Sequence, residues 1–273
     1  MPKVLTQEQI DSYRTDGYLA PMDGIDPADA AAMLEDLDAF EAANGISAGQ
    51  LQMKGHLCFR RSYNFTFNPR ILDVVADLIG PNILSFASRF WIKGAQDGSH
   101  VTWHQDSAYF GLDPHELVTV WLAITDSTPD MGCMKVIPGS HRGAAYEHEE
   151  TFAEDNLLAR GQVIHGIDDR DAVYLPLKQG QFSCHHERIL HASDPNDTQT
   201  TRIGLALFFI PTHVRSTIRR RTANLVRGED EYRYWDADPV PKGRLDDEII
   251  NHIRAAGERY VDPKYRQEAE ADA

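Results

Sequence analysis

The tripeptide His104-Gln105-Asp106 places two metal-binding side chains two positions apart in the sequence. On an extended strand, residues two apart point to the same side, so this imidazole and this carboxylate can face one ion. Alone the tripeptide is weak evidence, because a chain with 12 histidines and 42 acidic residues produces such a pair readily by chance. A third candidate ligand, His191, lies further along the chain, and Arg202 follows it. The four residues together predict a metal centre with an anion-binding group beside it.

Two imidazoles and one carboxylate on one face of an octahedron leave the remaining coordination positions open. An Fe(II) ion held in this way can take a bidentate 2-oxo acid and then O₂. His185 and His186 compete with His191 for the third ligand position. His191 is favoured because a polar turn follows it and because the sequence spacing from His191 to Arg202 is typical of residues on successive strands. For His186 the pattern favours a hydrogen-bonding role facing the pocket.

Arg202 directly precedes an apolar stretch at residues 203–208. A surface ion pair is one interpretation of such an arginine. A charge that enters an apolar strand should instead be buried and paired. Its planar guanidinium can bind a carboxylate through two parallel hydrogen bonds, which would fix the end of the 2-oxo acid that reaches the metal.

The segments that must position these residues have the alternation of β-strands. Apolar and polar residues alternate at 83–93 and 118–125, and further strands are predicted at 134–137, 180–186 and 203–210. Turn-rich segments separate them, for example Pro138-Gly139-Ser140. Short strands with this spacing predict a β-sandwich or jelly roll.

Three helices are predicted before these strands. The first begins with a capping box at Thr6 and Gln9 and ends at Gly17, the second runs from Asp26-Pro27 to Gly45, and the third runs from Asn68-Pro69 to Gly80. We therefore expect a mainly β protein with flanking α-helices, forming a single domain over residues 1–273. Residues 215–238 are predicted to be a solvated loop with local charge pairing, and residues 268–273 are predicted to be disordered.

The composition limits the partners. Acidic residues outnumber basic ones 42 to 27, a net charge of −15, which disfavours nucleic acid and anionic membrane surfaces. No run of eighteen apolar residues occurs and the N-terminus is polar, so we expect a cytoplasmic protein with no membrane contact. The three cysteines suggest no disulfide framework or zinc site. The expected partner is a small molecule, and the chain is expected to be a monomer or a homodimer.

The sequence resembles the phytanoyl-CoA dioxygenase family of Fe(II)/2-oxoglutarate oxygenases. The resemblance rests on residues 103–106, 120–126, 132–141, 180–186 and 191–193 together with Asn196 and Arg202. It implies a double-stranded β-helix, the jelly roll of cupin-like proteins, with Fe(II) as cofactor and with 2-oxoglutarate and O₂ as cosubstrates. It also implies that Arg202 binds the distal carboxylate of 2-oxoglutarate and that the residues around the cosubstrate are Gln105, Thr119, Trp121 and Ser193.

Because Asp106 is present, the resemblance implies hydroxylation rather than halogenation. The leading substrate is a small zwitterion, an aminoalkyl- or trimethylammonioalkyl-phosphonate, since residues 106–112 resemble the phosphonate-hydroxylating members. Basic groups at residues 60–61 and 89–93 agree with an anionic substrate. The predicted substrate contacts are Arg61, Asn64, Lys93 and Tyr109.

Three other functions stay open. One is hydroxylation of a betaine- or ectoine-like solute. Another is a metal-binding jelly-roll module without turnover, because a fold alone does not give activity. The third is a cupin-like isomerase or hydrolase that uses a divalent metal without O₂.

Overall fold

Two β-sheets form the body of the protein. The computed structural model describes residues 2–51, 53–242 and 247–261. The larger sheet contains, in spatial order, β1 (Tyr18–Asp23), β10 (Gln181–His186), β5 (Val118–Ala123), β12 (Arg202–Pro211), β2 (Ile83–Lys93), β14 (Thr222–Arg227) and β15 (Asp236–Ala237). The smaller sheet contains β3 (Val101–His104), β11 (His191–Ser193), β6 (Met134–Val136) and β9 (Val173–Tyr174). Short strands also form separate pairs: β4 (Leu112–Asp113) pairs with β13 (Arg215–Ser216), and β7 (Glu149–Glu150) pairs with β8 (Gln162–Val163). The predicted mainly β jelly roll is confirmed.

The three predicted helices are present. α1 (Gln7–Asp16) has the capping box of Thr6 and Gln9, and Gly17 ends it in a left-handed conformation. α2 (Pro27–Asn44) and α4 (Pro69–Ile79) begin at the predicted prolines. Asp26 occupies the N-cap position of α2, but its side chain makes no capping hydrogen bond and instead accepts a hydrogen bond from Arg70 at 3.0 Å.

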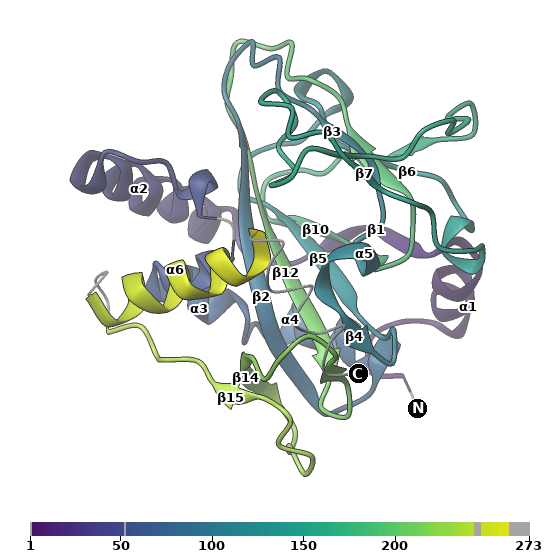
Figure 1. Ribbon diagram of the computed structural model, residues 1–273, viewed down its shortest axis with the longest axis vertical. Helices are drawn as coiled ribbons and strands as arrows, with labels where there is room; N and C mark the ends of the chain where they lie inside the picture. Colours follow the sequence, from purple (N-terminus) through teal and green to yellow (C-terminus); the bar gives the residue numbers. More distant parts are fainter. Residues whose placement is uncertain (1, 52, 243–246, 262–273) are drawn as a thin grey trace.

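Two apolar layers lie on the two faces of the larger sheet. On the outer face, Val120, Leu205 and Phe209 belong to one buried cluster with the helices. Figure 1 shows α2 and α6 (Asp247–Val261) gathered beside β2 with α3 (Arg60–Phe65). On the inner face, Trp121 and Phe208 belong to a second cluster that includes residues of the smaller sheet. The strand alternation therefore divides the larger sheet into a helix-covered face and a face turned to the interior.

Residues 215–238 are not the loop that was predicted. β14 pairs antiparallel with β2 and extends the larger sheet, and Trp235 is buried with its Nε1 donating to the carbonyl of Val214 at 2.8 Å. Local charge pairing does occur on the surface, as in the 2.8 Å ion pair of Arg220 with Asp236. Pairing with β2 outweighs the weak strand signal of this charged segment.

The remaining expectations have mixed outcomes. Among the described residues, no helix is long and apolar enough to cross a membrane. The three cysteines are buried and free. The end of the chain predicted to be disordered, residues 268–273, lies outside the described residues. The single domain, the oligomeric state and the cytoplasmic location stay predictions.

Candidate active site

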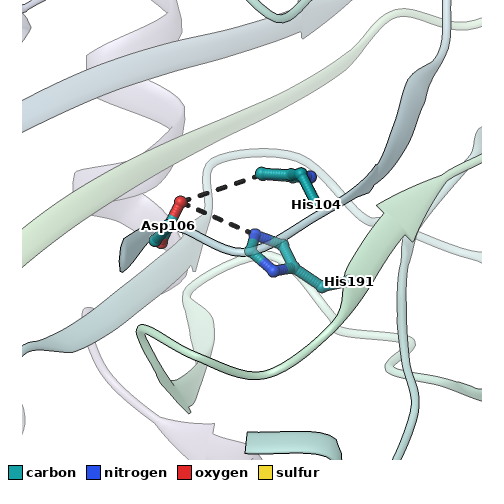
Figure 2. A group of neighbouring side chains, drawn as sticks. All are labelled: His104, Asp106 and His191. Carbon is teal, nitrogen blue, oxygen red and sulfur yellow. Dashed lines mark ion pairs between the residues drawn. The ribbon is translucent and has the colours of Figure 1, made fainter. Parts of the chain in front are cut away.

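His104, Asp106 and His191 meet between the two sheets (Figure 2). His104 ends β3, Asp106 follows two residues later, and His191 begins β11. β3 and β11 are antiparallel neighbours in which His191 lies directly opposite His104. One ligand atom from each side chain lies within 4.8 Å of the others, and all three residues are buried. Strand pairing thus brings together residues that are far apart in the sequence.

Each imidazole turns the same nitrogen toward the carboxylate. Nε2 of His104 and Nε2 of His191 both lie 3.8 Å from Oδ1 of Asp106. Their Nδ1 atoms lie 2.9 Å and 3.0 Å from the carbonyl oxygens of Thr102 and Ile189. An Nδ1–H that donates to a carbonyl leaves a lone pair on Nε2, the arrangement of metal-binding histidines.

The charges in this cluster also suit a divalent cation. Burial lowers the pKa of His104 to about 4 and the pKa of His191 well below its usual value, so both rings are neutral near pH 7. Burial would raise the pKa of Asp106, but the neighbouring imidazoles of His185, His191 and His104 hold it below its usual range. Two neutral nitrogens and one anionic oxygen are the donor set of non-haem Fe(II) sites.

The second oxygen of Asp106 faces different groups. The hydroxyl of Thr119 donates to Oδ2 at 2.9 Å. Nε2 of His185 lies 3.6 Å from the same oxygen. Thr119 was predicted to contact the cosubstrate; the structure shows it lining the cavity and bound to Asp106.

A cavity extends from the cluster to Arg202. Predicted cosubstrate residues Thr119, Trp121 and Ser193 line it together with Arg202. The Arg202 guanidinium lies 5.2 Å from the centre of the Trp121 ring, and its buried Nε has no hydrogen-bond partner in the described part of the chain. Burial lowers the pKa of Arg202 to about 10, so the side chain remains a cation at neutral pH. A buried cation without a partner is costly, and a carboxylate such as that of 2-oxoglutarate would supply the missing acceptor.

Lys93 lies beside Arg202, because the two residues are opposite each other in β2 and β12. Its Nζ donates to Oγ of Ser193 at 2.8 Å and to the carbonyl of Asp194. Burial, and then the charge of Arg202, lower the pKa of Lys93 to about 7. Its amine is directed to the chain segment after β11, and the predicted substrate contact stays a prediction.

Gln105 points away from the cavity that its two neighbours face. Its Nε2 donates to the carbonyl of Arg188 at 2.7 Å, and its Oε1 accepts from the backbone of Tyr146 at 3.0 Å. Side chains alternate along extended chain, so the residue between His104 and Asp106 faces the opposite side. The structure therefore gives Gln105 a role in fixing the segment at Tyr146 rather than a place at the cosubstrate.

Two of the predicted substrate contacts are not brought to the cavity. Arg61 lies on α3 and donates to Asp36 of α2 at 2.8 Å. Asn64 is exposed, and both residues line a separate surface hollow between these helices. Tyr109, by contrast, is buried with its ring 5.9 Å from that of His104.

The sequence predicted that His186 faces the pocket, and this prediction is wrong. His185 lines the cavity, whereas His186 points away and packs 5.1 Å from the ring of His141. Consecutive residues of β10 face opposite sides, so only one of the two can face the cluster. The usable signal was that Phe182 and Cys184 are apolar and belong to the outer core, which places Ser183 and His185 on the inner face.

A family model described as Phytanoyl-CoA dioxygenase (PhyH) matches residues 2–204. The chain belongs to the phytanoyl-CoA dioxygenase family. Membership confirms the predicted family. The predicted class of 2-oxoglutarate-dependent non-haem iron dioxygenases and the predicted cofactors Fe(II) and 2-oxoglutarate agree with this family and with the buried ligand cluster. The individual site residues stay predictions, and the geometry supports the three metal ligands and Arg202 but not Gln105, Arg61 or Asn64.

Similar proteins differ in how much of their length the chain matches. A Stutzerimonas stutzeri protein named "Probable alpha-ketoglutarate-dependent hypophosphite dioxygenase" is 28% identical over 60% of this chain and 58% of its own length. Peroxisomal phytanoyl-CoA dioxygenase of Homo sapiens is 29% identical over 52% of this chain and 43% of its own length. The chain thus spans about half the length of these curated relatives. The solved structure of the apo non-heme monooxygenase ThoJ is 31% identical, with a TM-score of 0.81, over 97% of this chain and 99% of that one.

Proposed function

We propose that the chain hydroxylates a small zwitterionic metabolite in a reaction that depends on Fe(II) and 2-oxoglutarate. The observation that carries the proposal is one cavity that contains a buried two-histidine, one-carboxylate cluster and Nε of Arg202, which has no hydrogen-bond partner among the described residues. In this proposal the cluster of His104, Asp106 and His191 holds the metal, and Arg202 binds the far carboxylate of 2-oxoglutarate. The metal and the 2-oxo acid supply the oxidative chemistry with O₂.

The protein residues bind and orient the cosubstrate, and they keep water out of the cavity. Arg202 fixes one end of the cosubstrate, since a guanidinium binds a carboxylate in a defined orientation. Trp121 supports the guanidinium on one face. Apolar side chains of Val101, Met134 and Phe208 form much of the remaining cavity wall and exclude water from the reacting groups.

The leading substrate remains an aminoalkyl- or trimethylammonioalkyl-phosphonate. The name of the Stutzerimonas stutzeri relative, which refers to another phosphorus oxyanion, supports this choice. Two further basic side chains lie beside residues that line the cavity: Lys93, next to Arg202, and Arg89, whose guanidinium lies 4.0 Å from the centre of the Trp91 ring. Trp91 itself lines the cavity. Arg61 and Asn64 do not belong to this part of the proposal, because they lie elsewhere.

A substrate comparison tests the proposal. The purified protein with Fe(II), ascorbate and 2-oxoglutarate is offered phosphonate zwitterions and, separately, betaine- and ectoine-like carboxylate zwitterions. We expect succinate together with a product one oxygen atom heavier for a phosphonate. Coupled turnover of carboxylate zwitterions alone would replace the phosphonate by the alternative substrate class.

The same material distinguishes the other classes. A binding module without turnover would form no succinate with any compound, and an isomerase or hydrolase would turn over without consuming O₂. Either result would refute the proposed hydroxylation. The cytoplasmic location is a further part of the proposal and rests on the sequence alone.

A further inference from the structure

His185 is a buried polar side chain at the cluster to which the proposed function gives no role. It is 1% exposed, and neither ring nitrogen has a hydrogen-bond partner in the described part of the chain. Its ring centre lies 4.6 Å from that of His191. A polar group that is buried without a hydrogen-bond partner destabilises the fold, so its presence here calls for a function.

Strand register places this ring beside Thr119. His185 and Thr119 are opposite each other in the antiparallel pair β10 and β5, and both side chains line the cavity. Directly opposite residues have neighbouring side chains on one face of a sheet. The wall opposite the cluster therefore presents a hydroxyl and an imidazole side by side.

The two oxygens of Asp106 divide between two sets of groups. Oδ1 lies 3.8 Å from Nε2 of both His104 and His191. Oδ2 accepts from the Thr119 hydroxyl at 2.9 Å and lies 3.6 Å from Nε2 of His185. A small approach of the ring would bring His185 within hydrogen-bond distance of Oδ2.

We propose that His185 is a positioning residue that, with Thr119, holds Oδ2 of Asp106 so that only Oδ1 is offered to the metal. The inference rests on the proposed function, since it assumes that the cluster binds a metal. Groups that orient a ligating carboxylate without touching the metal change metal affinity by about 10- to 100-fold when they are removed. A carboxylate confined to one oxygen also leaves more of the coordination sphere to the cosubstrates.

Binding of Co(II), a spectroscopic substitute for Fe(II), tests this inference without any turnover. Titrations under argon would give the affinity, and the visible absorption bands of the bound ion would report its coordination geometry. We expect His185→Leu to weaken Co(II) binding about 10- to 100-fold and to alter the spectrum. His185→Gln, whose amide can donate in place of the imidazole, should recover much of the affinity and the wild-type spectrum.

The neighbouring residue provides the matched control. His186→Leu removes an imidazole from the same strand on the opposite side, and it should leave Co(II) affinity and spectrum unchanged. Circular dichroism checks the fold of each variant, and if the leucine variant fails to fold, His185→Gln compared with His185→Ala carries the test. A merely structural His185 would change stability without changing the Co(II) spectrum.

Two failures can be told apart. If the wild-type protein bound no Co(II), the proposed function would be wrong and this inference with it. If the wild-type protein bound Co(II) and both folded His185 variants bound it with the same affinity and spectrum, the inference alone would be wrong.

Discussion

Replacing Gly204 by alanine, which adds one carbon atom, should disable the proposed 2-oxoglutarate pocket. It lies in β12, and the indole of Trp121 packs against its backbone. A β-carbon added here would lie 1.9 Å from Cζ2 of Trp121 and 2.4 Å from both Cε2 and Cη2. All three overlaps fall on one rigid ring rather than on the end of a flexible side chain. Gly204→Ala must therefore displace the indole or bend the strand.

The size of the effect follows from these distances. Ordinary van der Waals contact begins at 3.4 Å, so the ring must move by at least about 1.5 Å. Overpacking of this kind costs about 1 to 3 kcal/mol of folding free energy. The Arg202 guanidinium lies 5.2 Å from the centre of the same ring and loses its support when the ring moves. We expect the Kd for 2-oxoglutarate to rise at least about tenfold, which corresponds to about 1.4 kcal/mol.

Anaerobic calorimetric titration of the metal-loaded protein with 2-oxoglutarate measures the Kd, and urea unfolding measures the free energy of unfolding. Gly98→Ala is the matched control, because a β-carbon there meets nothing within 4 Å. The control should change neither quantity. A Gly204→Ala variant with wild-type 2-oxoglutarate affinity would refute the assignment of the pocket beside Trp121 and Arg202.

Further substitutions test the cluster and its surroundings. The proposed metal ligands are His104, Asp106 and His191. Alanine at any one of them should abolish Fe(II)-dependent succinate formation and metal binding in a folded protein. Retention of iron affinity would exclude that residue as a ligand. Arg202→Leu should raise the 2-oxoglutarate Kd by about two powers of ten while iron binding survives, and an unchanged Kd would contradict its role. Arg61→Ala and Asn64→Ala should leave the substrate KM unchanged, since both residues lie away from the cavity; a raised KM would return them to the site. Burial lowers the pKa of His56 to about 3, so only the unfolded chain takes up a proton there as the pH falls below about 6.5. The free energy of unfolding should therefore decrease from pH 7.5 to pH 5.5, by about 1.4 kcal/mol at this residue, and His56→Gln should show a smaller decrease in urea unfolding; an equal decrease would contradict the shift.

Local signals in the sequence were sufficient for most of the elements. The capping box at Thr6 and the glycine at Gly17 specify both ends of α1 through hydrogen bonds within a few residues. Alternation predicted β2 and β5, since one face of each strand meets the helices and the other the interior. β12 was predicted as a further strand bounded by a turn-rich segment. The family and its cofactors followed from motifs spread over several of these strands.

The elements that were missed depend on contacts distant in sequence. β14 forms because β2 offers its edge, and α6 contributes Ile249 and Ile253 to the outer core. The charges around β14 suggested solvent, whereas Ile249 and Ile253 of α6 have the spacing of one helix face, a signal that the sequence analysis did not use. Tertiary pairing overrides such weak propensities.

The same dependence on contacts distant in sequence explains why Arg61 was predicted to contact the substrate although it lies away from the cavity. A basic cluster at Arg60 and Arg61 in an acidic chain suggested an anion site, but Arg61 pairs with Asp29 and Asp36 of the neighbouring helix. Composition shows that a cation is present, whereas only the fold shows which carboxylate is its neighbour. In a chain with a net charge of −15, acidic residues are numerous enough to supply such partners for a surface arginine.

Two histidines at the end of β10 and one at the start of β11 show how strand face and register decide which side chain reaches the cluster. His185, His186 and His191 are alike in type, and the sequence left the choice of the third ligand to the turn that follows His191. The structure distinguishes them by face and register: His191 is paired with His104 across β3 and β11, His185 faces Oδ2 of Asp106, and His186 faces away. Parity along β10 was readable from Phe182 and Cys184, but the register that sets His191 opposite His104 joins segments far apart in the chain. The assignment of the third ligand therefore depends on sheet pairing, which no local pattern encodes.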